Sequence, residues 1–271
     1  MKKRDKIWHF IIVFASIIIT IITISSCKKD TMNNSYIAKA IVQAYLVDGQ
    51  PISIYVKKEI LIGSTDTATQ TIDNLVVKIT SAGNTVTLNA KGHGLYVDST
   101  YKAIAGQTYN LNFLYNGVEI TSSTIVPTKP SGVQISATSL SIPANTYNTS
   151  SIAPLNLTWS NSNNDFFLVL VQLFQSADTL SPIDTSSHFH RHGFFRNQPM
   201  QSSSYQISPR DFSYYGVYNV ILFKLNPEYA ALYNGSDNNS QNLTKPICNI
   251  NNGLGIFSGI NADTLKITIG D

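Results

Sequence analysis

Short runs of alternating apolar and polar residues, separated by turn-forming residues, recur along most of this chain. The clearest run is residues 109–115, where tyrosine, leucine and phenylalanine alternate with asparagine up to Phe113. A period of two residues predicts a half-buried β-strand. Val118–Val126 is its expected hairpin partner, because Asn116-Gly117 between them favours a tight turn. This pattern excludes a mainly helical fold.

The segment from Ile37 to Val126 holds about seven such strand candidates, with turn residues every 8–12 positions. Ser81–Asn84 reads as a second hairpin turn, between Leu75–Thr80 and Thr85–Leu88. We therefore expect an immunoglobulin-like antiparallel sandwich here. Pro127-Thr128-Lys129-Pro130 ends it, since two prolines in four residues stop a strand and stiffen the link.

The second half predicts a larger antiparallel β domain with one short helix. Its expected strands are Val133–Ile142, Leu155–Trp159, Phe166–Phe174 (buried on both faces), a stretch within Phe212–Leu225, and Leu265–Ile269. Asn226 suits the N-cap of a helix and Pro227 its first position. The helix should stop at Asn234-Gly235.

The first 27 residues read as a targeting signal. Met1–Lys6 is basic, Ile7–Ile24 is largely apolar, and small residues precede Cys27. This layout is that of a bacterial secretory signal, and the cysteine after Ser25-Ser26 resembles a lipoprotein signal, in which that thiol is acylated. The alternatives are a transmembrane anchor, for which about 27 Å of helix is marginal, and plain secretion.

These patterns give an all-β chain of two β-sandwich-like domains behind a lipoprotein signal peptide. The expected parts are a signal peptide at residues 1–26, a tether at 27–35, an N-terminal Ig-like sandwich at 36–127 and a C-terminal β-rich domain at 131–271. Acyl chains on Cys27 would hold the protein in the outer membrane, on its periplasmic or cell-surface face.

The charge balance argues against nucleic-acid binding. The formal net charge is +3, and residues 1–26 account for all of it, with four cationic residues and Asp5. The rest of the chain is neutral, whereas a nucleic-acid binder carries a basic face on its folded part. Of the two cysteines, Cys248 remains if Cys27 is acylated, and we expect it to be a small buried side chain.

Three histidines in five residues form the one conspicuous cluster, His188, His190 and His192. On a strand, alternate residues point to the same side, so two or three imidazoles could hold Zn²⁺ or Cu²⁺. The alternatives are a solvated loop without a metal and a pH-responsive surface. No other cofactor is expected.

No catalytic motif emerges from the sequence. There is no G-x-S-x-G, no H-E-x-x-H and no glycine-rich phosphate loop, and the carboxylates are scattered singly. His93, in a Gly-His-Gly turn, and the tyrosines at 214, 215 and 218 are read as turn, core and cover residues. We therefore expect a protein that is not an enzyme, with a hydrolase of surface glycans or peptides as an alternative.

Several segments resemble one family, the Bacteroidetes outer-membrane lipoproteins known as domain of unknown function 4249 (DUF4249). The resemblance covers nearly the whole mature chain. The segments that carry it are Ala40–Gly49, Leu75–Thr80, Gly94–Tyr96, Ala105–Leu111, Leu157–Trp159, Tyr215–Tyr218 and Asn249–Phe257, the last being the most specific. It implies a lipid-anchored, two-part β protein that works beside a TonB-dependent receptor, and it implies no catalytic residues.

The expected function is thus a non-enzymatic accessory lipoprotein that binds a partner or ligand. The alternatives are a metal-binding protein that uses the histidine run and a structural or adhesive protein of the cell envelope.

Overall fold

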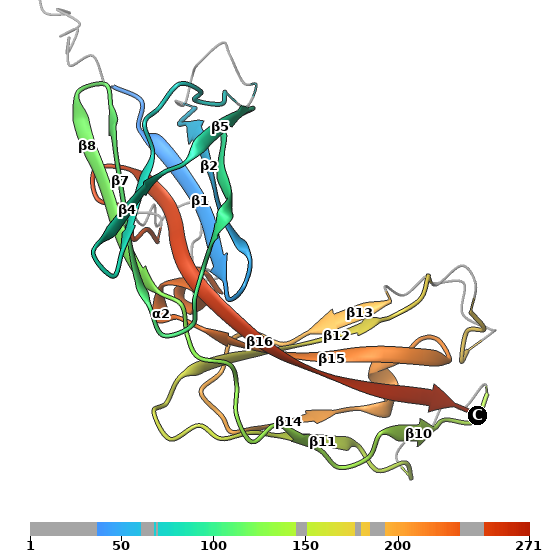
Figure 1. Ribbon diagram of the computed structural model, residues 1–271. Helices are drawn as coiled ribbons and strands as arrows, with labels where there is room; N and C mark the ends of the chain where they lie inside the picture. The colour runs from blue at the N-terminus through green and yellow to red at the C-terminus, as the bar shows by residue number, and fades with distance from the viewer. Residues whose placement is uncertain are drawn as a thin grey trace, which may run out of the picture. The chain divides into compact units, whose positions relative to one another are not determined.

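The computed structural model describes residues 37–60, 68, 70–144, 151–176, 180–184, 193–233 and 247–271. Strands are the main secondary structure of these residues, beside a short α-helix, α2 (Pro227–Ala230), and a 3-10 helix, η3 (Pro209–Asp211). The strands belong to three sheets (Figure 1). The all-β fold class expected from the alternating sequence is confirmed.

The first half pairs two sheets around one core. Its strands are β1 (Ala40–Val47), β2 (Pro51–Lys58), β3 (Lys78–Ser81), β4 (Asn84–Thr87), β5 (Asn89–Gly92), β6 (Leu95–Lys102), β7 (Thr108–Tyr115) and β8 (Val118–Ile125). Strands β1, β2, β6 and β5 are consecutive in a nine-stranded sheet, and β4-β3-β7-β8 form a four-stranded sheet. Inward-facing side chains of both sheets share a core, in which Tyr96, Tyr109 and Phe257 are fully buried.

The predicted hairpin turns are present. Strands β3 and β4 are joined through Ala82-Gly83, and β7 and β8 through Asn116-Gly117. All four of these residues have positive φ, the backbone of a two-residue hairpin turn that asparagine and glycine tolerate best.

The second half has its own core between two further layers. Its strands are β9 (Gln134–Ile135), β10 (Ser139–Ser141), β11 (Leu155–Thr158), β12 (Phe166–Leu173), β13 (Phe194–Arg196), β14 (Ser204–Ile207) and β15 (Gly216–Leu225). A three-stranded sheet, β14-β11-β9, packs against the β13-β12-β15 end of the nine-stranded sheet. Trp159 lies in this core with its ring centroid 5.3 Å from that of Phe167.

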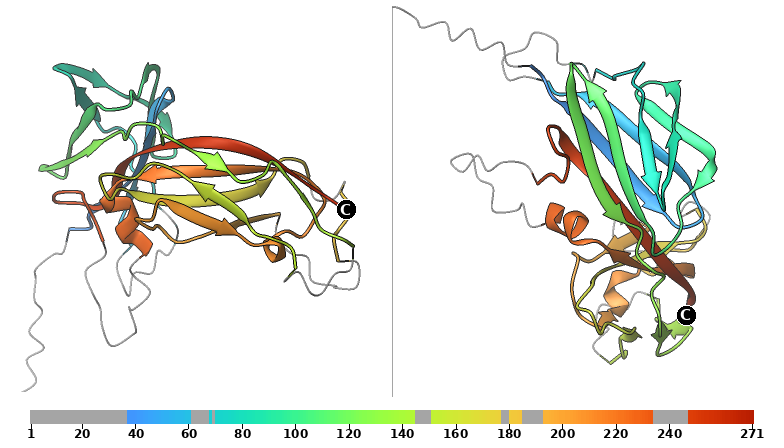
Figure 2. Two further views of the ribbon diagram at one scale, coloured as in Figure 1. Left: turned by 90° about the horizontal axis from the view of Figure 1, so that it is seen from below. Right: turned by 60° about the vertical axis from the view of Figure 1, so that its left-hand side comes forward.

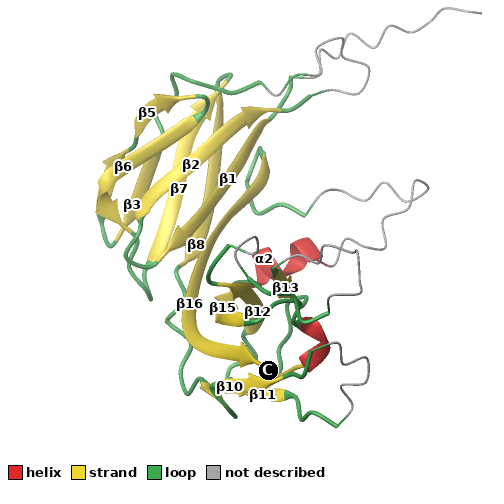
Figure 3. Ribbon diagram, turned by 90° about the vertical axis from the view of Figure 1, so that its right-hand side faces the viewer, coloured by secondary structure: helices red, strands yellow, loops and turns green. Residues whose placement is uncertain are grey.

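The last strand, β16 (Leu254–Gly270), pairs with strands of both halves (Figures 2 and 3). Its first part pairs in parallel with β1, from Ile41↔Leu254 to Val47↔Ile260. Its later part pairs antiparallel with β15 from Ile260 to Ile269, and in parallel with β10. The predicted strand at Leu265–Ile269 is therefore confirmed, and it starts eleven residues earlier than the alternation of its last residues suggests.

Asn249–Phe257, the stretch behind the strongest resemblance, fastens this strand to the first half. The side chain of Asn249 donates to the carbonyl of Phe257 (2.7 Å) and accepts from its N–H (3.0 Å). Asn251 exchanges backbone hydrogen bonds with Thr121 of β8, and the side chain of Asn252 donates to the carbonyl of Glu119 on the same strand (2.9 Å). Gly255 has φ +99° and lies against the backbone of Val42, so a side chain there would collide with β1. Hydrogen bonding and close backbone packing thus explain the asparagines and glycines of this segment.

Polar side chains join β8 to β16 and to α2. The Thr124 hydroxyl donates to Glu228 Oε1 (2.8 Å) and accepts from the Gly259 N–H and the Asn226 side chain (both 3.0 Å). The Asn261 side chain donates to the carbonyl of Pro127 (2.9 Å). Each buried donor here has a partner, so this group stabilises rather than weakens the fold.

Two details differ from the sequence-based expectations. Asn226 occupies the N-cap of α2, but its side chain makes no capping bond, since it donates to Thr124 and Ile125 instead. The helix itself is present, and its expected end at Asn234-Gly235 lies outside the described residues. Phe166–Phe174 was expected to be buried on both faces. That is wrong for its end, where Phe174 is 58% exposed.

The domain division at residues 127–131 stays a prediction. What the strand pairing adds is that residues 254–260, beyond that division, complete the sheet of the first half.

Candidate functional site

The outer side of the nine-stranded sheet in the second half carries a band of apolar and aromatic side chains. On β12, β15 and β16 one set of alternating residues, including Val171, Val220 and Ile267, enters the core. The other set must point outward. We call this outward set, with its neighbours on β13, the aromatic face; it comprises Leu170, Gln172, Phe174, Phe194, Arg196, Val217, Asn219, Ile221, Phe223, Thr264, Lys266 and Thr268.

One end of the aromatic face is covered by α2 and the turn that follows it. Leu168, Leu225 and Ile260 are buried there, with Tyr229 and Tyr233 packed on them. Tyr229 and Tyr233 are four residues apart, so they lie on the same side of a helical turn. The short helix thereby closes the apolar band at this end.

Aromatic contacts continue from this cover in both directions. The ring of Tyr229 lies 5.5 Å from that of Tyr45 on β1, edge to face, and 6.0 Å from that of Tyr233. Arg196 of β13 stacks over Tyr233, with its guanidinium carbon 5.2 Å from the ring centre, and also donates to its hydroxyl. Burial, reinforced by Tyr233, raises the pKa of Tyr229, so its hydroxyl stays protonated at neutral pH.

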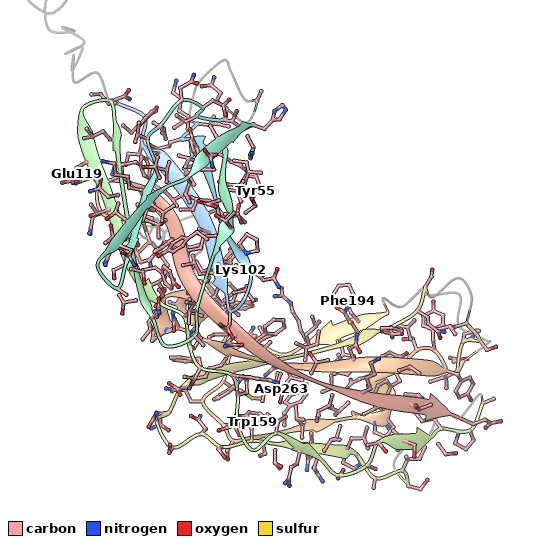
Figure 4. All side chains as sticks on the ribbon, in the orientation of Figure 1. Tyr55, Lys102, Glu119, Trp159, Phe194 and Asp263 are labelled. Atoms are coloured by element: carbon pink, nitrogen blue, oxygen red, sulfur yellow. The ribbon has the colours of Figure 1, made fainter. Side chains whose placement is uncertain are left out.

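At the other end of the face two aromatic side chains are exposed. Phe174 is 58% and Phe194 53% exposed, and Figure 4 shows Phe194 projecting from β13. The ammonium of Lys266 lies 4.5 Å above the centre of the Phe174 ring. Exposed aromatic rings beside cationic side chains are suited to contact with another molecule. Such rings bury a large surface area on binding and lose little side-chain entropy.

The charge of the aromatic face is one-sided. Its outward positions hold Arg196 and Lys266 and no aspartate or glutamate. Neither cation takes part in the two salt bridges found in the described residues, which are Lys129–Asp263 and Lys224–Asp165. Asn219 of β15 stands opposite Gln172 of β12 on one side and Lys266 of β16 on the other. Its Oδ1 atom is buried without a hydrogen-bond partner among the described residues. The face therefore fits an apolar surface that carries negative charge.

The site residues expected from the sequence lie outside the described part of the chain. These are Cys27 for lipidation and His188, His190 and His192 for a metal. The metal site and the lipidation site stay predictions. Within the described ranges, no group of three or more histidine, cysteine, aspartate or glutamate side chains is placed to hold a metal ion.

The remaining residues singled out earlier are structural where the structure describes them. Cys248 is half-buried beside the first core, and its sulfur accepts a hydrogen bond from the Ile250 N–H (3.3 Å). His93 lies in a turn with φ 54°. Tyr218 is buried and donates to the carbonyl of Tyr214, and Tyr215 donates to that of Ile142. These tyrosines are core and cover rather than an exposed platform.

The aromatic face was missed in the sequence. Its signal was present in the alternation of Leu168, Leu170 and Gln172, and in Tyr229 and Tyr233 at a helical spacing. Phe174 and Phe194, however, come from segments far apart in sequence, and only the register of β12 with β13 and β15 brings them to one surface.

Comparison with family models identifies the family of this chain. The domain of unknown function DUF4249 matches residues 32–266, so the chain belongs to that family. The resemblance inferred from the Asn249–Phe257 segment and its companions is thereby confirmed. No curated protein matches.

Solved structures give distant likenesses. The FN1–FN3 domains of chicken CNTN1 are 10% identical, with 86% of this chain and 67% of that chain covered, at a TM-score of 0.29. A crystal structure of domains from titin is 11% identical, with coverages of 85% and 66% and a TM-score of 0.20. In the part of the chain that the structure describes, no helix is long and apolar enough to cross a membrane.

Proposed function

We propose that this protein is a lipid-anchored accessory protein of the outer membrane, without enzymatic activity, that binds a partner through the aromatic face. The observation that carries the proposal is an exposed band of aromatic and aliphatic side chains with two cations and no carboxylate. A patch of that kind on a monomer marks a surface that another molecule covers.

The proposed anchor is the acylated Cys27. The sequence before it has the basic, apolar and small-residue order of a lipoprotein signal, and the family match starts five residues after it, at residue 32. Three acyl chains hold a protein firmly on a membrane, since two membrane-binding signals already suffice.

The proposed partner is a TonB-dependent receptor of the outer membrane, as the family resemblance implies. A receptor segment with apolar side chains and flanking carboxylates would complement Phe174 and Phe194 on one hand, and Arg196 and Lys266 on the other. Opposite charges of this kind mainly favour the right partner and its orientation.

The test is a tagged pull-down from gently solubilised outer membranes, with mass spectrometry of the bound proteins. The variant is Phe174→Ser/Phe194→Ser, and the matched control is Ile104→Ser, which changes a residue 52% exposed on the first half. We expect one receptor to co-purify stoichiometrically with the wild-type protein and the control, and to be lost with the double variant.

Two results would count against the proposal. Recovery of the protein alone would remove the receptor as partner. Retention of the receptor by the double variant would move the contact off the aromatic face. Cys27→Ser is the separate test of the anchor, because it should release the protein from the membrane and abolish incorporation of labelled palmitate.

A further inference from the structure

A second surface, independent of the aromatic face, lies at one end of the first sandwich. There β1 begins, β2 and β5 end, and the β7–β8 hairpin turns (Figure 1, top). We call it the N-terminal end, because the chain enters the first sheet here at Ala40. The opposite end of the same sandwich holds the turns at Asp48-Gly49 and at Ile104–Gly106.

Exposed aliphatic side chains gather at the N-terminal end. Val76 is 60% exposed and Leu114 63%, while Ile60 and Val118 are also exposed. They come from four separate segments: the end of β2, the approach to β3, the end of β7 and the start of β8. Their meeting at one end is a product of the fold, because no two of these segments except the β7–β8 hairpin are neighbours in sequence.

Three lysines lie at the same end of the sandwich. Lys57 and Lys58 end β2, and Lys91 lies in β5 beside the turn that leads to β6. None of the three takes part in a salt bridge with the described residues. The carboxylates at this end already accept hydrogen bonds within the sandwich: Glu59 from the Lys39 N–H, Asp73 from the Gly94 N–H, and Glu119 from the side chain of Asn112.

Exposed aliphatic side chains and lysines at one end of a sandwich match the interface of an anionic bilayer. Aliphatic groups enter the boundary between headgroups and acyl chains, and lysines bind the lipid phosphates while their stems stay apolar. Protein partners more often meet exposed aromatic residues and arginine, whereas Tyr115, which ends β7 here, is partly buried against the first core.

The chain length also favours a lipid surface. Cys27 precedes Ala38 by eleven residues, which span at most roughly 40 Å when fully extended. A tether this short holds the N-terminal end at a high effective concentration near the bilayer, so that weak contacts suffice.

We propose that the N-terminal end of the first sandwich is a membrane-contact surface, which docks on the anionic lipid surface that holds the acylated Cys27. Leu114, Val118 and Ile60 enter the interface, and Lys57, Lys58 and Lys91 bind lipid phosphates. The inference rests on the proposed anchor, and it fixes which end of the protein faces the membrane.

The test uses the full lipidated chain in vesicles of phosphatidylethanolamine and phosphatidylglycerol. In a Cys248→Ser background, a polarity-sensitive fluorophore is attached at Leu114→Cys, or at Ile104→Cys as the control. Ile104 is 52% exposed at the opposite end of the same sandwich. Emission and quenching by a lipid-borne quencher are then measured for both.

We expect the label at position 114 to shift to shorter wavelength and to be quenched at least threefold more than the label at 104. Lys57→Glu/Lys58→Glu/Lys91→Glu, or vesicles of phosphatidylcholine alone, should bring position 114 to the level of the control. These lysines are not core residues, so the triple variant should fold.

Equal quenching at the two positions in anionic vesicles overturns the inference. Shielding of position 114 in native outer membranes but not in pure lipid also overturns it, because the occupant would then be a protein. Flotation of the unlabelled protein with the vesicles is checked first. Its loss refutes the anchor itself and is thereby distinguished from a failure of the docking surface.

Discussion

Gly259 tests how firmly the last strand is held, because β16 passes the end of β8 there without room for a side chain. A Cβ at this position would lie 2.7 Å from the Cα of Val126, and closer still to the carbonyl oxygen of Ile125. Carbon atoms in good contact are about 3.5 Å apart. Both neighbours are backbone atoms, and the oxygen is the nearer, so Gly259→Ala must push the two strands apart by at least about 1 Å.

That displacement has a cost that can be estimated from the contacts at this point. Forcing a methyl group into a packed site costs about 1–3 kcal/mol. The Gly259 N–H bond to Thr124 (3.0 Å) and the Asn226 bond to the Ile125 carbonyl (2.7 Å) cross the same gap. Weakening each costs about 1 kcal/mol. We expect Gly259→Ala to lose roughly 3–5 kcal/mol, a large part of the stability of an ordinary domain.

The assay is urea unfolding of the mature chain, with Gly270→Ala as the control. Gly270 lies in the same strand, and a Cβ there would meet nothing within 4 Å. Its substitution should change the free energy of unfolding by no more than about 0.5 kcal/mol. Trp159 is the one tryptophan after residue 27, so fluorescence follows the second half while circular dichroism follows both. Because β16 belongs to both halves, the two signals should shift together. Equal stability of the two variants would refute this account of the junction.

Three further predictions follow from the structure. Asn249→Ala removes both hydrogen bonds to Phe257 and should cost about 2 kcal/mol in the same urea assay, whereas Asn163→Ala, on a surface turn, should be neutral. Burial raises the pKa of Tyr229, so its protonated form favours the folded state below about pH 10, and this contribution is lost as the pH rises towards the folded pKa. Tyr229→Phe should therefore lessen the fall in urea midpoint between pH 8 and pH 11, and an unchanged fall would contradict the assignment. A chain that ends at residue 246 lacks β16 and should show no cooperative unfolding by either signal; a normal transition in circular dichroism would show that the first half does not need this strand.

Much of the fold could be predicted because its hairpins are determined by residues close together in the sequence. The Asn116-Gly117 turn lies between two alternating segments that pair along their full length, and Ala82-Gly83 joins two shorter ones. Alternation also located the final strand at Leu265–Ile269. Its first part was not evident, since Ile256 and Phe257 are both buried and the strand has a layer on each side there.

The candidate site could be predicted only in part. The residues of the aromatic face alternate as in any half-buried strand, so the sequence shows an apolar side without showing whether another layer covers it. Coverage depends on how far α2 and the turn after it extend over the outer side of β12 and β15, which is a long-range property. Asn226 illustrates the same limit at one residue: local pattern favours a helix cap, but Thr124, more than a hundred positions earlier, offers its side chain a buried partner.

The pairing of β1 with β16 sets the order in which this protein can mature. Ile41 and Leu254 stand opposite each other although more than two hundred residues separate them. The first strand of the chain therefore cannot pair on this side until β16 has been synthesised. Until then β1 has an open edge and the Phe257 side of the first core is empty. Neither half can complete its sheet until β16 has been made and has paired with β1 and β15. The pairing of the seventeen residues of β16 is thus the closing step of assembly, and it commits both halves to one folding event.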